Sequence, residues 1–447
     1  MANDADTEGV GTMADQCDIN GLASRSDAQI ARCELDGPRA PRPDELDAVL
    51  DLVNNTFNPM GRTMGLEFPQ LLSDANLARL RVFVDPQTRA PVAHAGYVRC
   101  ELAVEGCRIP AAGLGSVCTE QAYRGMGLAS ELVESITQQA VAEGLVMMLI
   151  SGGSNVYRRL GAADTGDFLR VEANREQISN LREAATDWPM HLRAAMRLAA
   201  EDDIPAMASI YRREPVRYVR SVSDFRGLAW QEPGVKRLGS LERTWIGGLA
   251  SDSLAYVIVR IRTADHAADQ IADHRSDHTA DHTANHTVDH AAHHATDHAA
   301  DRTADHTVDH TAGRAADHAA HHAIDRGETR LHVAEFAGAR CCVQQLVAHA
   351  CAEYDPDILT MAVPGSDLEM ATLLHQAGLT LHHVGLLGHT VMSLDDRALL
   401  ECVGPIMNER FGADWTMPSP PPAGPELIRW LFADLRIPLP VPGLNYV

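Results

Sequence analysis

The sequence is short of positive charge and of aromatic side chains. It has 38 Lys and Arg against 61 Asp and Glu, which gives a formal net charge of −23. Because proteins that coat nucleic acid need clustered basic side chains, this balance argues against a nucleic-acid partner. Aromatic residues make up only 5% of the chain, which we interpret as a compositional bias without functional meaning.

Signals for export, membrane insertion and metal binding by cysteine are also missing. The first 16 residues have neither a basic start nor an apolar stretch, so we expect no signal peptide. The apolar run at residues 145–150 is far too short to span a bilayer. The nine cysteines are odd in number and include no C-x-x-C pair, so neither a disulfide framework nor a zinc finger is expected. We therefore predict a cytoplasmic protein in a reducing setting, with no membrane partner and no metal.

The chain does have enough apolar residues to build a core. Hydrophobic residues make up 45% of its 447 residues, and this length suggests two to four domains. Residues 1–27 are small, polar and acidic, so we expect this segment to be disordered.

Residues 28–180 have the pattern of a mixed α/β domain. We predict a helix at 41–57, strands at 80–85, 92–104 and 108–119, a helix at 127–144, a buried strand at 145–151 and a short helix or turn at 154–161. Glu105-Gly106 reads as a hairpin turn, and Gly144 suits the position that ends the long helix.

The second half repeats this order over residues 188–398. We predict a helix at 199–214, strands at 255–262 and 330–338, a helix at 341–354, a strand at 358–364, a helix at 367–379 and a strand at 381–394. We interpret it as a tandem copy of the same fold. Residues 399–447 add a helix and a proline-rich tail, which we expect to dock on the second domain through Trp430, Leu431 and Phe432.

A low-complexity block occupies residues 263–329 and holds fourteen of the 22 histidines. Asp recurs there at intervals of four, which forms no stable apolar face on a helix, so we expect a disordered insertion. Pairs such as His274/His278 and His282/His286 have the spacing of transition-metal ligands. We favour the alternative, a neutral repeat expansion without any function, because a surface loop tolerates long insertions.

One segment carries a pattern with chemical meaning, at residues 113–133. A strand ends near Thr119, and Arg124, Gly125, Met126, Gly127, Leu128 and Ala129 then lead into the long helix. Free N–H groups and the helix dipole make such a start a binding site for anions, and small residues let a pyrophosphate approach the backbone. The P-loop pattern does not fit because Lys is missing, and the Rossmann pattern does not fit because Ser130 replaces its third glycine.

This segment resembles the acetyl-CoA motif of the GNAT superfamily, [Q/R]-x-x-G-x-[G/A], through Arg124, Gly127 and Ala129. Downstream, SNVYRRLGA at 154–162 is similar to the superfamily's second signature, with Ala162 in place of Phe. The tandem arrangement resembles the enhanced-intracellular-survival (Eis) type, in which a competent GNAT domain precedes a degenerate one. The second domain has no glycine pair at its corresponding helix, in ARCCVQQ, and the sterol-carrier-like third domain of that group is not evident after residue 400.

The resemblance implies roles for further residues. The edge of the strand at Val117, Cys118 and Thr119 would pair with the pantetheine arm and polarise the thioester. Tyr157 would act as general acid toward the CoA thiolate, and Arg158 and Arg159 are candidates to neutralise CoA phosphates. Glu101, Glu120 and His94 stay open as the base, as does the terminal carboxylate of Val447, which the Eis type implies.

The function that follows is an N-acetyltransferase, which moves acetyl from acetyl-CoA directly to an amine of a small or peptidic cationic substrate. Cys118 would allow a covalent acyl-enzyme, but direct transfer is the rule in the superfamily. Eis-like relatives imply a homo-oligomer. A non-catalytic acyl-CoA-binding protein and a His-rich metal-binding protein are the alternatives.

Overall fold

The computed structural model describes residues 35–59, 62–152, 154–188, 194–229, 236–237, 240–248, 254–263, 328–385, 390–412 and 416–441. The predicted disordered segment 1–27, residues 264–327 of the low-complexity block and Val447 lie outside the described residues. Within the described part, no helix is both long and apolar enough to cross a bilayer.

The described elements alternate along the chain much as the apolar periodicity predicts. The helices are α2 (Leu46–Phe57), α3 (Met64–Glu67), α4 (Leu128–Ala142), α5 (Asn155–Arg159), α6 (Arg175–Thr186), α7 (Ile204–Tyr211), α8 (Val222–Ala229), α11 (Arg340–Tyr354), α12 (Leu368–Gln376), α13 (Asp396–Phe411) and α14 (Gly424–Arg429). The strands are β1 (Asp36–Arg39), β2 (Leu80–Val84), β3 (Pro91–Val104), β4 (Cys107–Thr119), β5 (Met147–Ile150), β6 (Ala163–Asp164), β7 (Phe168–Asn174), β8 (Ala195–Leu198), β9 (Val216–Tyr218), β10 (Lys236–Arg237), β11 (Ser240–Gly248), β12 (Leu254–Arg262), β13 (Arg330–Gly338), β14 (Ile358–Pro364), β15 (Leu381–Val384) and β16 (Thr390–Ser393).

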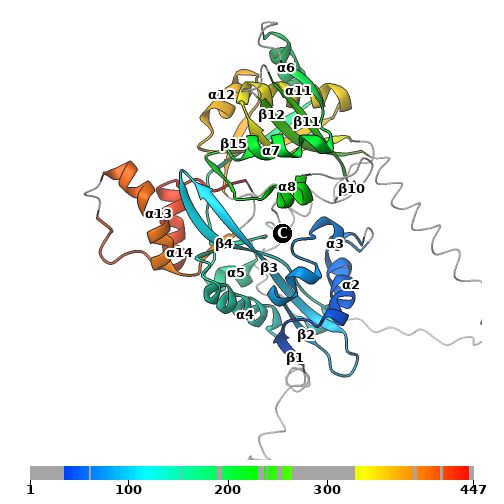
Figure 1. Ribbon diagram of the computed structural model, residues 1–447, viewed down its shortest axis with the longest axis vertical. Helices are drawn as coiled ribbons and strands as arrows, with labels where there is room; N and C mark the ends of the chain where they lie inside the picture. The colour runs from blue at the N-terminus through cyan, green and yellow to red at the C-terminus, as the bar shows by residue number, and fades with distance from the viewer. Residues whose placement is uncertain are drawn as a thin grey trace, which may run out of the picture.

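Two separate sheets organise these elements (Figure 1). The first has the order β1-β2-β3-β4-β5-β16-β6, with β9 paired to β3, and the second has the order β10-β11-β12-β13-β14-β7-β15, with β8 paired to β11. Each sheet contains a parallel strand–helix–strand unit, β4–α4–β5 in the first and β13–α11–β14 in the second. The predicted mixed α/β class is confirmed.

The two sheets exchange a strand, which the sequence analysis did not foresee. β7 comes from the first half of the chain but pairs with β14 and β15 of the second sheet, and β16 comes from the second half but pairs with β5 and β6 of the first. The single strand predicted at 381–394 is wrong for this reason. It forms two short strands, β15 and β16, that lie in different sheets. The predicted domain boundaries at 180 and 188 divide the chain into two consecutive halves, whereas each sheet contains strands from both halves.

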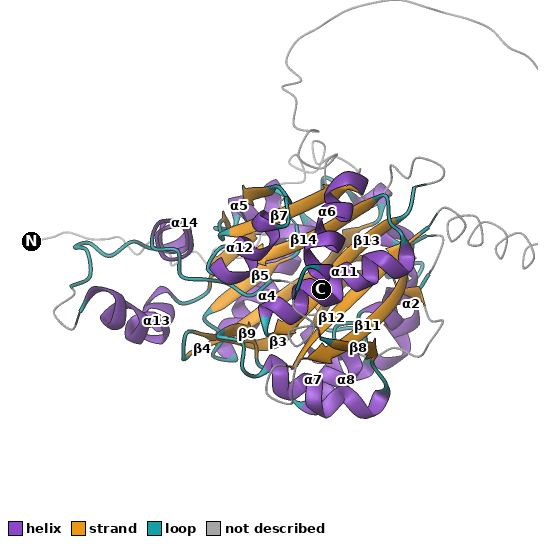
Figure 2. Ribbon diagram, turned by 90° about the horizontal axis from the view of Figure 1, so that it is seen from above, coloured by secondary structure: helices purple, strands orange, loops and turns teal. Residues whose placement is uncertain are grey.

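The first sheet is covered differently on its two faces. On one face α4 packs through Leu128, Leu132 and Ile136 against strand residues that include Ala95 and Leu114. On the opposite face α2 covers one end of the sheet, and α13 and α14 cover the other end. Figure 2 shows α13 and α14 projecting to one side of the molecule. Between these two ends, the middle of this second face borders the cavity described below.

The C-terminal segment does not dock on the second domain, as the sequence analysis predicts through Trp430, Leu431 and Phe432. Leu431 and Phe432 are fully buried, and Trp430 packs beside them, against a cluster that contains Leu102 and Ile109 of the first sheet. The C-terminal segment thus docks on the first sheet and not on the second domain. It packs there because β16, its neighbour in sequence, already belongs to that sheet.

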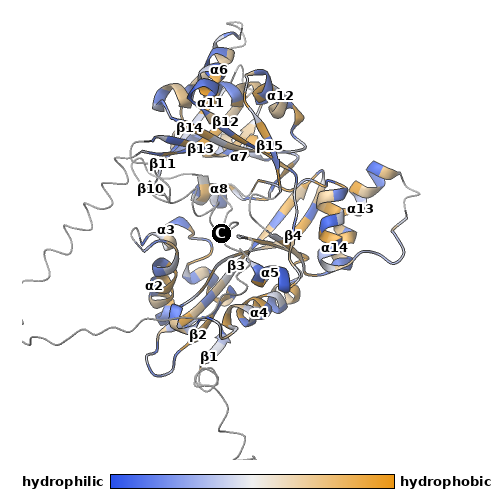
Figure 3. Ribbon diagram, turned by 180° about the vertical axis from the view of Figure 1, so that it is seen from behind, coloured by the Kyte–Doolittle hydropathy of each residue, from blue (hydrophilic) through white to orange (hydrophobic). Residues whose placement is uncertain are grey.

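The second sheet is buried on both faces. α6, α11 and α12 pack on one face, with Val343, Leu346 and Leu374 fully buried, and α7 and α8 pack on the other, where Tyr256 and Phe225 lie. Figure 3 shows these strands as predominantly hydrophobic and the helices as mixed, with hydrophilic stretches along them. Burial on both faces explains why β12 reads as a continuous apolar run.

Candidate active site

β4 and β5 run in parallel and then separate. Their register extends from Ala111↔Met147 to Leu114↔Ile150, whereas β4 continues to Thr119 and stays paired with β3 on its other side. The backbone N–H and the hydroxyl of Ser151 both donate to the carbonyl of Leu114, at 3.2 and 3.3 Å. Beyond this point residues 115–119 present an edge that no described strand pairs with.

A bulge shapes this edge at Ser116. The register with β3 shifts between His94 and Gly96, and Ser116 has a φ of +48°. The carbonyl of Ser116 lies 2.9 Å from Nδ1 of His94, whose side chain is completely buried. Desolvation lowers the pKa of His94 to about 4, so the ring is neutral at pH 7. Because a carbonyl only accepts, the proton sits on Nδ1.

The loop after β4 has the geometry of an anion site. Gly125 and Gly127 both have φ of +82°, and α4 begins directly after Gly127. Both glycines are exposed, so a ligand can approach the start of the helix, where N–H groups without an intrahelical partner are expected. Arg124 donates from Nε to the carbonyl of Thr119 at 3.1 Å, and the hydroxyl of Tyr123 donates to Asp85 at 2.9 Å. These contacts hold the loop against the strands.

Cys118 faces away from the open edge. Its side chain is buried in the cluster below α2, with Val53 and Val82, and burial raises the pKa of the thiol to about 12. Val117, the next residue back, packs instead toward α4. Burial therefore keeps Cys118 as a protonated thiol, which is a poor nucleophile.

Tyr157 sits on α5, which follows the divergence of the strands. The helix is capped by Ser154, whose hydroxyl accepts from the N–H of Val156 at 3.4 Å. Tyr157 is 8% exposed and belongs to the same buried cluster as Leu114 and Leu128. Its neighbour Arg158 is held by both oxygens of Asp164, each at 2.9 Å. Arg158 therefore forms an ion pair with Asp164. The side chain of the next residue, Arg159, is exposed to solvent.

A cavity of about 420 Å³ lies on the face of the first sheet opposite α4. Its floor is formed by β3, β4 and β5 and includes Leu114, Ile150 and Ser151, the residues at which the strands separate. Gln70, Ser73 and Asn76 line one side, the segment from Tyr218 to Arg220 and α8 line the other, and Pro440 of the C-terminal segment completes it. The cavity therefore ends at the last paired residues of β4 and β5, next to the start of the open edge.

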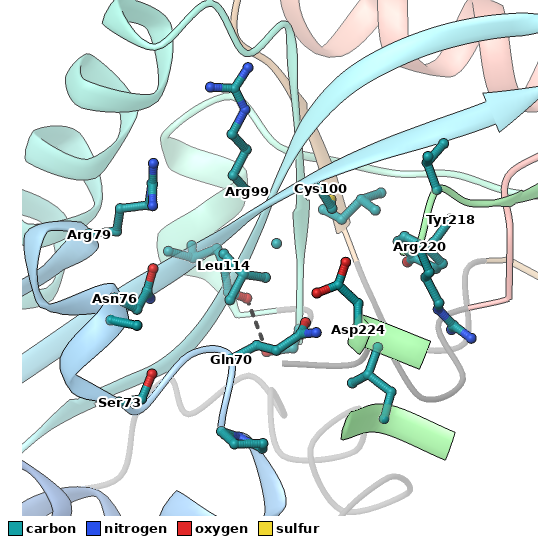
Figure 4. Close-up of a pocket in the computed structure, with 18 of the residues that line it drawn as sticks. Gln70, Ser73, Asn76, Arg79, Arg99, Cys100, Leu114, Tyr218, Arg220 and Asp224 are labelled. Carbon is teal, nitrogen blue, oxygen red and sulfur yellow. Dashed lines mark hydrogen bonds between the residues drawn. The ribbon is translucent and has the colours of Figure 1, made fainter. Parts of the chain in front are cut away.

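Asp224 has the only carboxylate among the described residues that line this cavity. Its Oδ2 accepts from the N–H and the hydroxyl of Ser221, at 3.1 and 2.6 Å, in a reciprocal cap of α8. Figure 4 shows the carboxylate pointing into the middle of the cavity, whereas Arg99 and Arg220 point away from it. The sequence analysis missed Asp224 because its pattern, S-x-x-D before a helix, indicates only a cap.

The predicted base candidates lie elsewhere. His94, Glu101 and Glu120 do not line the cavity as described. His94 is engaged at the bulge, Glu101 accepts from Arg108 at 2.9 Å, and Glu120 is exposed at the end of β4. Val447, the remaining candidate, lies outside the described residues.

Comparison with known proteins now bears on this site. Residues 38–164 match the family described as acetyltransferase (GNAT) domain. This segment is a GNAT acetyltransferase domain. It contains β4, the glycine loop, α4, β5 and α5, so the GNAT match covers every element that forms the open edge. No curated protein matches the sequence.

Solved structures extend the likeness beyond this GNAT domain. A GCN5-related N-acetyltransferase from Anabaena variabilis ATCC 29413 has 12% identity, with 80% of this chain and 72% of that chain covered and a TM-score of 0.51. A probable N-acyltransferase from Enterococcus faecalis V583 has 12% identity, with 81% and 73% covered and a TM-score of 0.50. Eis1 from Mycobacterium abscessus is also similar, with 13% identity, 82% and 75% covered and a TM-score of 0.47. The predicted GNAT fold is confirmed.

Proposed function

We propose that this chain transfers an acetyl group from acetyl-CoA to an amine of a cationic substrate, without a covalent enzyme intermediate. One observation carries the proposal. The cavity reaches Leu114 and Ile150, the last paired residues of β4 and β5, directly before the open edge begins at residue 115. A donor that lies along the edge and an acceptor in the cavity would bring their reacting atoms together at this point, and such positioning supplies much of the rate in acyl transfer.

The donor would be held by backbone groups. The N–H groups between Gly125 and Ala129 would bind the pyrophosphate, with Arg124 nearby, and the edge from Val117 to Thr119 would pair with the pantetheine arm. An N–H of this edge would stabilise the oxyanion that forms on the thioester carbonyl. Tyr157 would then protonate the departing thiolate. CoA supplies the activated acyl group, and the protein supplies the geometry.

The acceptor would enter the cavity as a cation. The inward carboxylate of Asp224 and the formal net charge of −23 both favour a positively charged substrate. A polyamine, an aminoglycoside and a lysine-like side chain all have this chemistry, and each must present one neutral amine to the thioester.

The terminal carboxylate is a candidate to deprotonate that amine. Pro440 lines the cavity, and the seven residues that follow it span at most on the order of 20 Å when extended. Removal of Val447 alone should lower turnover if its position supplies the base.

Thermal unfolding with and without acetyl-CoA tests the donor site. Ligand at a hundred times its dissociation constant should stabilise the wild type by roughly 2.7 kcal/mol. Gly125→Glu puts a negative charge into the loop and should abolish this shift. Gly144→Glu is the matched control, because Gly144 ends the same helix with φ of +76° against +82° for Gly125, and neither position has an atom within 4 Å of an added Cβ. A shift that survives in Gly125→Glu would rule this loop out.

Turnover distinguishes the proposal from a binding protein without activity. Release of free thiol from acetyl-CoA should depend on an added amine, with spermidine, kanamycin and Nα-acetyl-lysine as the first probes. Binding of acetyl-CoA without release on any amine would favour the non-catalytic alternative. The metal-binding alternative concerns residues 264–327, which lie outside the described part, and deletion of these residues should leave turnover unchanged.

A further inference from the structure

The second sheet lacks the glycine loop of the first, and an internal carboxylate lies beside the helix that starts there. β13, α11 and β14 form the same parallel unit as β4, α4 and β5, with register from Arg330↔Ile358 to Val333↔Met361. In the first sheet eight residues, 120–127, connect strand and helix, whereas here Ala339 alone lies between β13 and α11. The start of α11 therefore occupies the position at which the first domain presents its N–H groups.

Glu214 lies beside the end of β13 and the start of α11. Its Oε1 accepts from the N–H of Gly338 at 2.8 Å and from Nη1 of Arg340 at 2.9 Å, and its Oε2 accepts from Nη2 of Arg340 at 2.6 Å. Arg340 is held in turn by Asp367, at 2.6 Å from Nε, and by the carbonyl of Gly338. The side chains of Glu214 and Arg340 are 13% and 14% exposed. A two-pronged guanidinium–carboxylate pair with an added N–H donor is among the strong polar contacts of proteins.

Glu214 also begins the segment that forms one wall of the cavity. Directly after it, the carbonyl of Pro215 accepts from the N–H of Glu105 at 2.9 Å, and β9 pairs with β3 of the first sheet. The N–H of Val219 then donates to the carbonyl of Glu101 at 2.7 Å. The chain therefore crosses from the second sheet to the first within a few residues.

Arg220 returns the segment to the second sheet. Its guanidinium makes two hydrogen bonds to Glu335 of β13, at 3.0 and 2.8 Å, and lies over the ring of Tyr211 at 4.3 Å. The stretch between Glu214 and Arg220 is thus fixed at both ends to the second sheet. Tyr218, Val219 and Arg220 are the part of this stretch that lines the cavity.

We infer that Glu214 is a positioning residue for the acyl-acceptor cavity. Its carboxylate binds the N–H of Gly338 and the guanidinium of Arg340 and so anchors the wall formed by residues 216–220 to the second sheet. The term acceptor cavity rests on the proposed function, whereas the anchoring does not. One consequence follows: loss of Glu214 loosens the wall without affecting the donor loop.

Hydrogen–deuterium exchange of the wall tests the inference without any acyl-CoA. The amides of Tyr218 and Val219 donate to the hydroxyl of Tyr211 and to Glu101, so their exchange reports whether the wall is held. In Glu214→Ala their exchange should rise at least about tenfold, the size expected for loss of a charged hydrogen-bonded contact. Asp203→Ala is the matched control, because Asp203 is 15% exposed and makes a similar two-pronged pair with Arg197 in the same half of the chain. It should leave these amides unchanged.

Formate provides a readout that a general loss of structure would not give. Added formate can occupy the space vacated in Glu214→Ala and pair with Arg340, so slow exchange should return. It should not return in Glu214→Gln, which keeps the volume filled but loses the charge. Exchange in Glu214→Ala at the wild-type rate, an equal rise in Asp203→Ala, or no rescue by formate would each overturn the inference. If Glu214→Ala does not fold, faster exchange confined to the wall in Glu214→Gln supports the inference, and unchanged exchange overturns it.

Failure of the proposed function would appear in a different experiment. A wild type that does not bind acetyl-CoA contradicts the proposed function and leaves the exchange result standing.

Discussion

Nδ1 of His94 lies 2.9 Å from the carbonyl oxygen of Ser116, at the bulge that gives β4 its open edge. Both residues are buried, so this contact satisfies a carbonyl that the bulge removes from the sheet. A buried group without its partner costs about 1–3 kcal/mol. His94 thus belongs to the framework of the open edge and does not contact the cavity.

The first prediction concerns the pH dependence of stability. Burial depresses the pKa of His94 from 6.5 to about 4, so between these values the unfolded chain binds the additional proton. The free energy of unfolding should therefore fall as the pH is lowered from 6.5 toward 4, by up to roughly 3 kcal/mol from this residue. Urea unfolding at several pH values gives the free energy of unfolding as a function of pH. This free energy should fall more steeply toward acid pH in the wild type than in His94→Asn. Equal pH dependence in the two proteins would show that His94 is not buried as a neutral ring.

The second prediction separates direct transfer from a covalent route. With a pKa of about 12, only about one Cys118 thiol in 10⁵ is ionised at pH 7. Cys118→Ala should therefore keep kcat within about threefold and lose on the order of 1 kcal/mol of stability from the small cavity. Mass spectrometry after incubation with acetyl-CoA alone should find no added acetyl group. An acetylated wild type that is absent in Cys118→Ala would favour the covalent route.

The third prediction concerns Tyr157 as general acid. Tyr157→Phe keeps the ring in its buried cluster but removes the hydroxyl, so kcat should fall by about 10²-fold or more. The dissociation constant of acetyl-CoA should stay within about twofold, as measured by calorimetry. Tyr354→Phe, at the end of α11 in the second sheet, is the control and should have normal turnover. Equal turnover in the two variants would remove Tyr157 from the chemistry.

The fourth prediction concerns Asp224 and the acceptor. Asp224→Asn preserves the size of the side chain and an oxygen for the cap of α8, but removes the charge. KM for the amine should rise about tenfold, and kcat should change little, because a charged contact to a bound cation contributes about 1.5 kcal/mol or more. Ser221→Ala tests the cap alone and should lower stability without this change in KM. If both variants raise KM equally, Asp224 affects binding of the amine only by capping α8 and not by contact with the cation.

The fifth prediction compares a buried ion pair with an exposed one. The side chains of Arg220 and Glu335 are 2% and 9% exposed. Arg220→Ala leaves the buried carboxylate with a hydrogen bond from the hydroxyl of Tyr256 but without its charged partner, and should cost about 3–5 kcal/mol. Arg397→Ala breaks a pair in which Arg397 is 89% exposed and should cost less than about 0.5 kcal/mol. Denaturant midpoints measure both. Similar small losses would mean that Glu335 gains another partner.

Local periodicity was enough to predict most elements of the first domain. The spacing of Leu128, Leu132 and Ile136 follows one helix face, and all three are buried against the sheet. Glu105 and Gly106 both have positive φ, as the predicted hairpin turn requires. Gly144 ends α4 with φ of +76°, again as predicted. Such features depend on neighbours within a few residues, so the sequence contains all the information they need.

The missed features all depend on residues far apart in the chain. Nothing in the periodicity of β7 or β16 indicates which sheet each strand joins, because both sheets offer an apolar edge of the same kind. For the same reason the C-terminal helix was assigned to the wrong domain. The cavity likewise joins Gln70, Leu114, Asp224 and Pro440, which share no local motif.

The sequence by itself therefore determined the elements, the glycine loop at Gly125 and Gly127 and the resemblance to the GNAT superfamily, because these depend on contiguous residues. Only the tertiary structure decided the exchange of strands, the place of the C-terminal segment and the pairing of Glu214 with Arg340. These relationships are set by which surfaces meet when the chain is packed, and a residue such as Glu214 has no local pattern to distinguish it from an ordinary exposed acid.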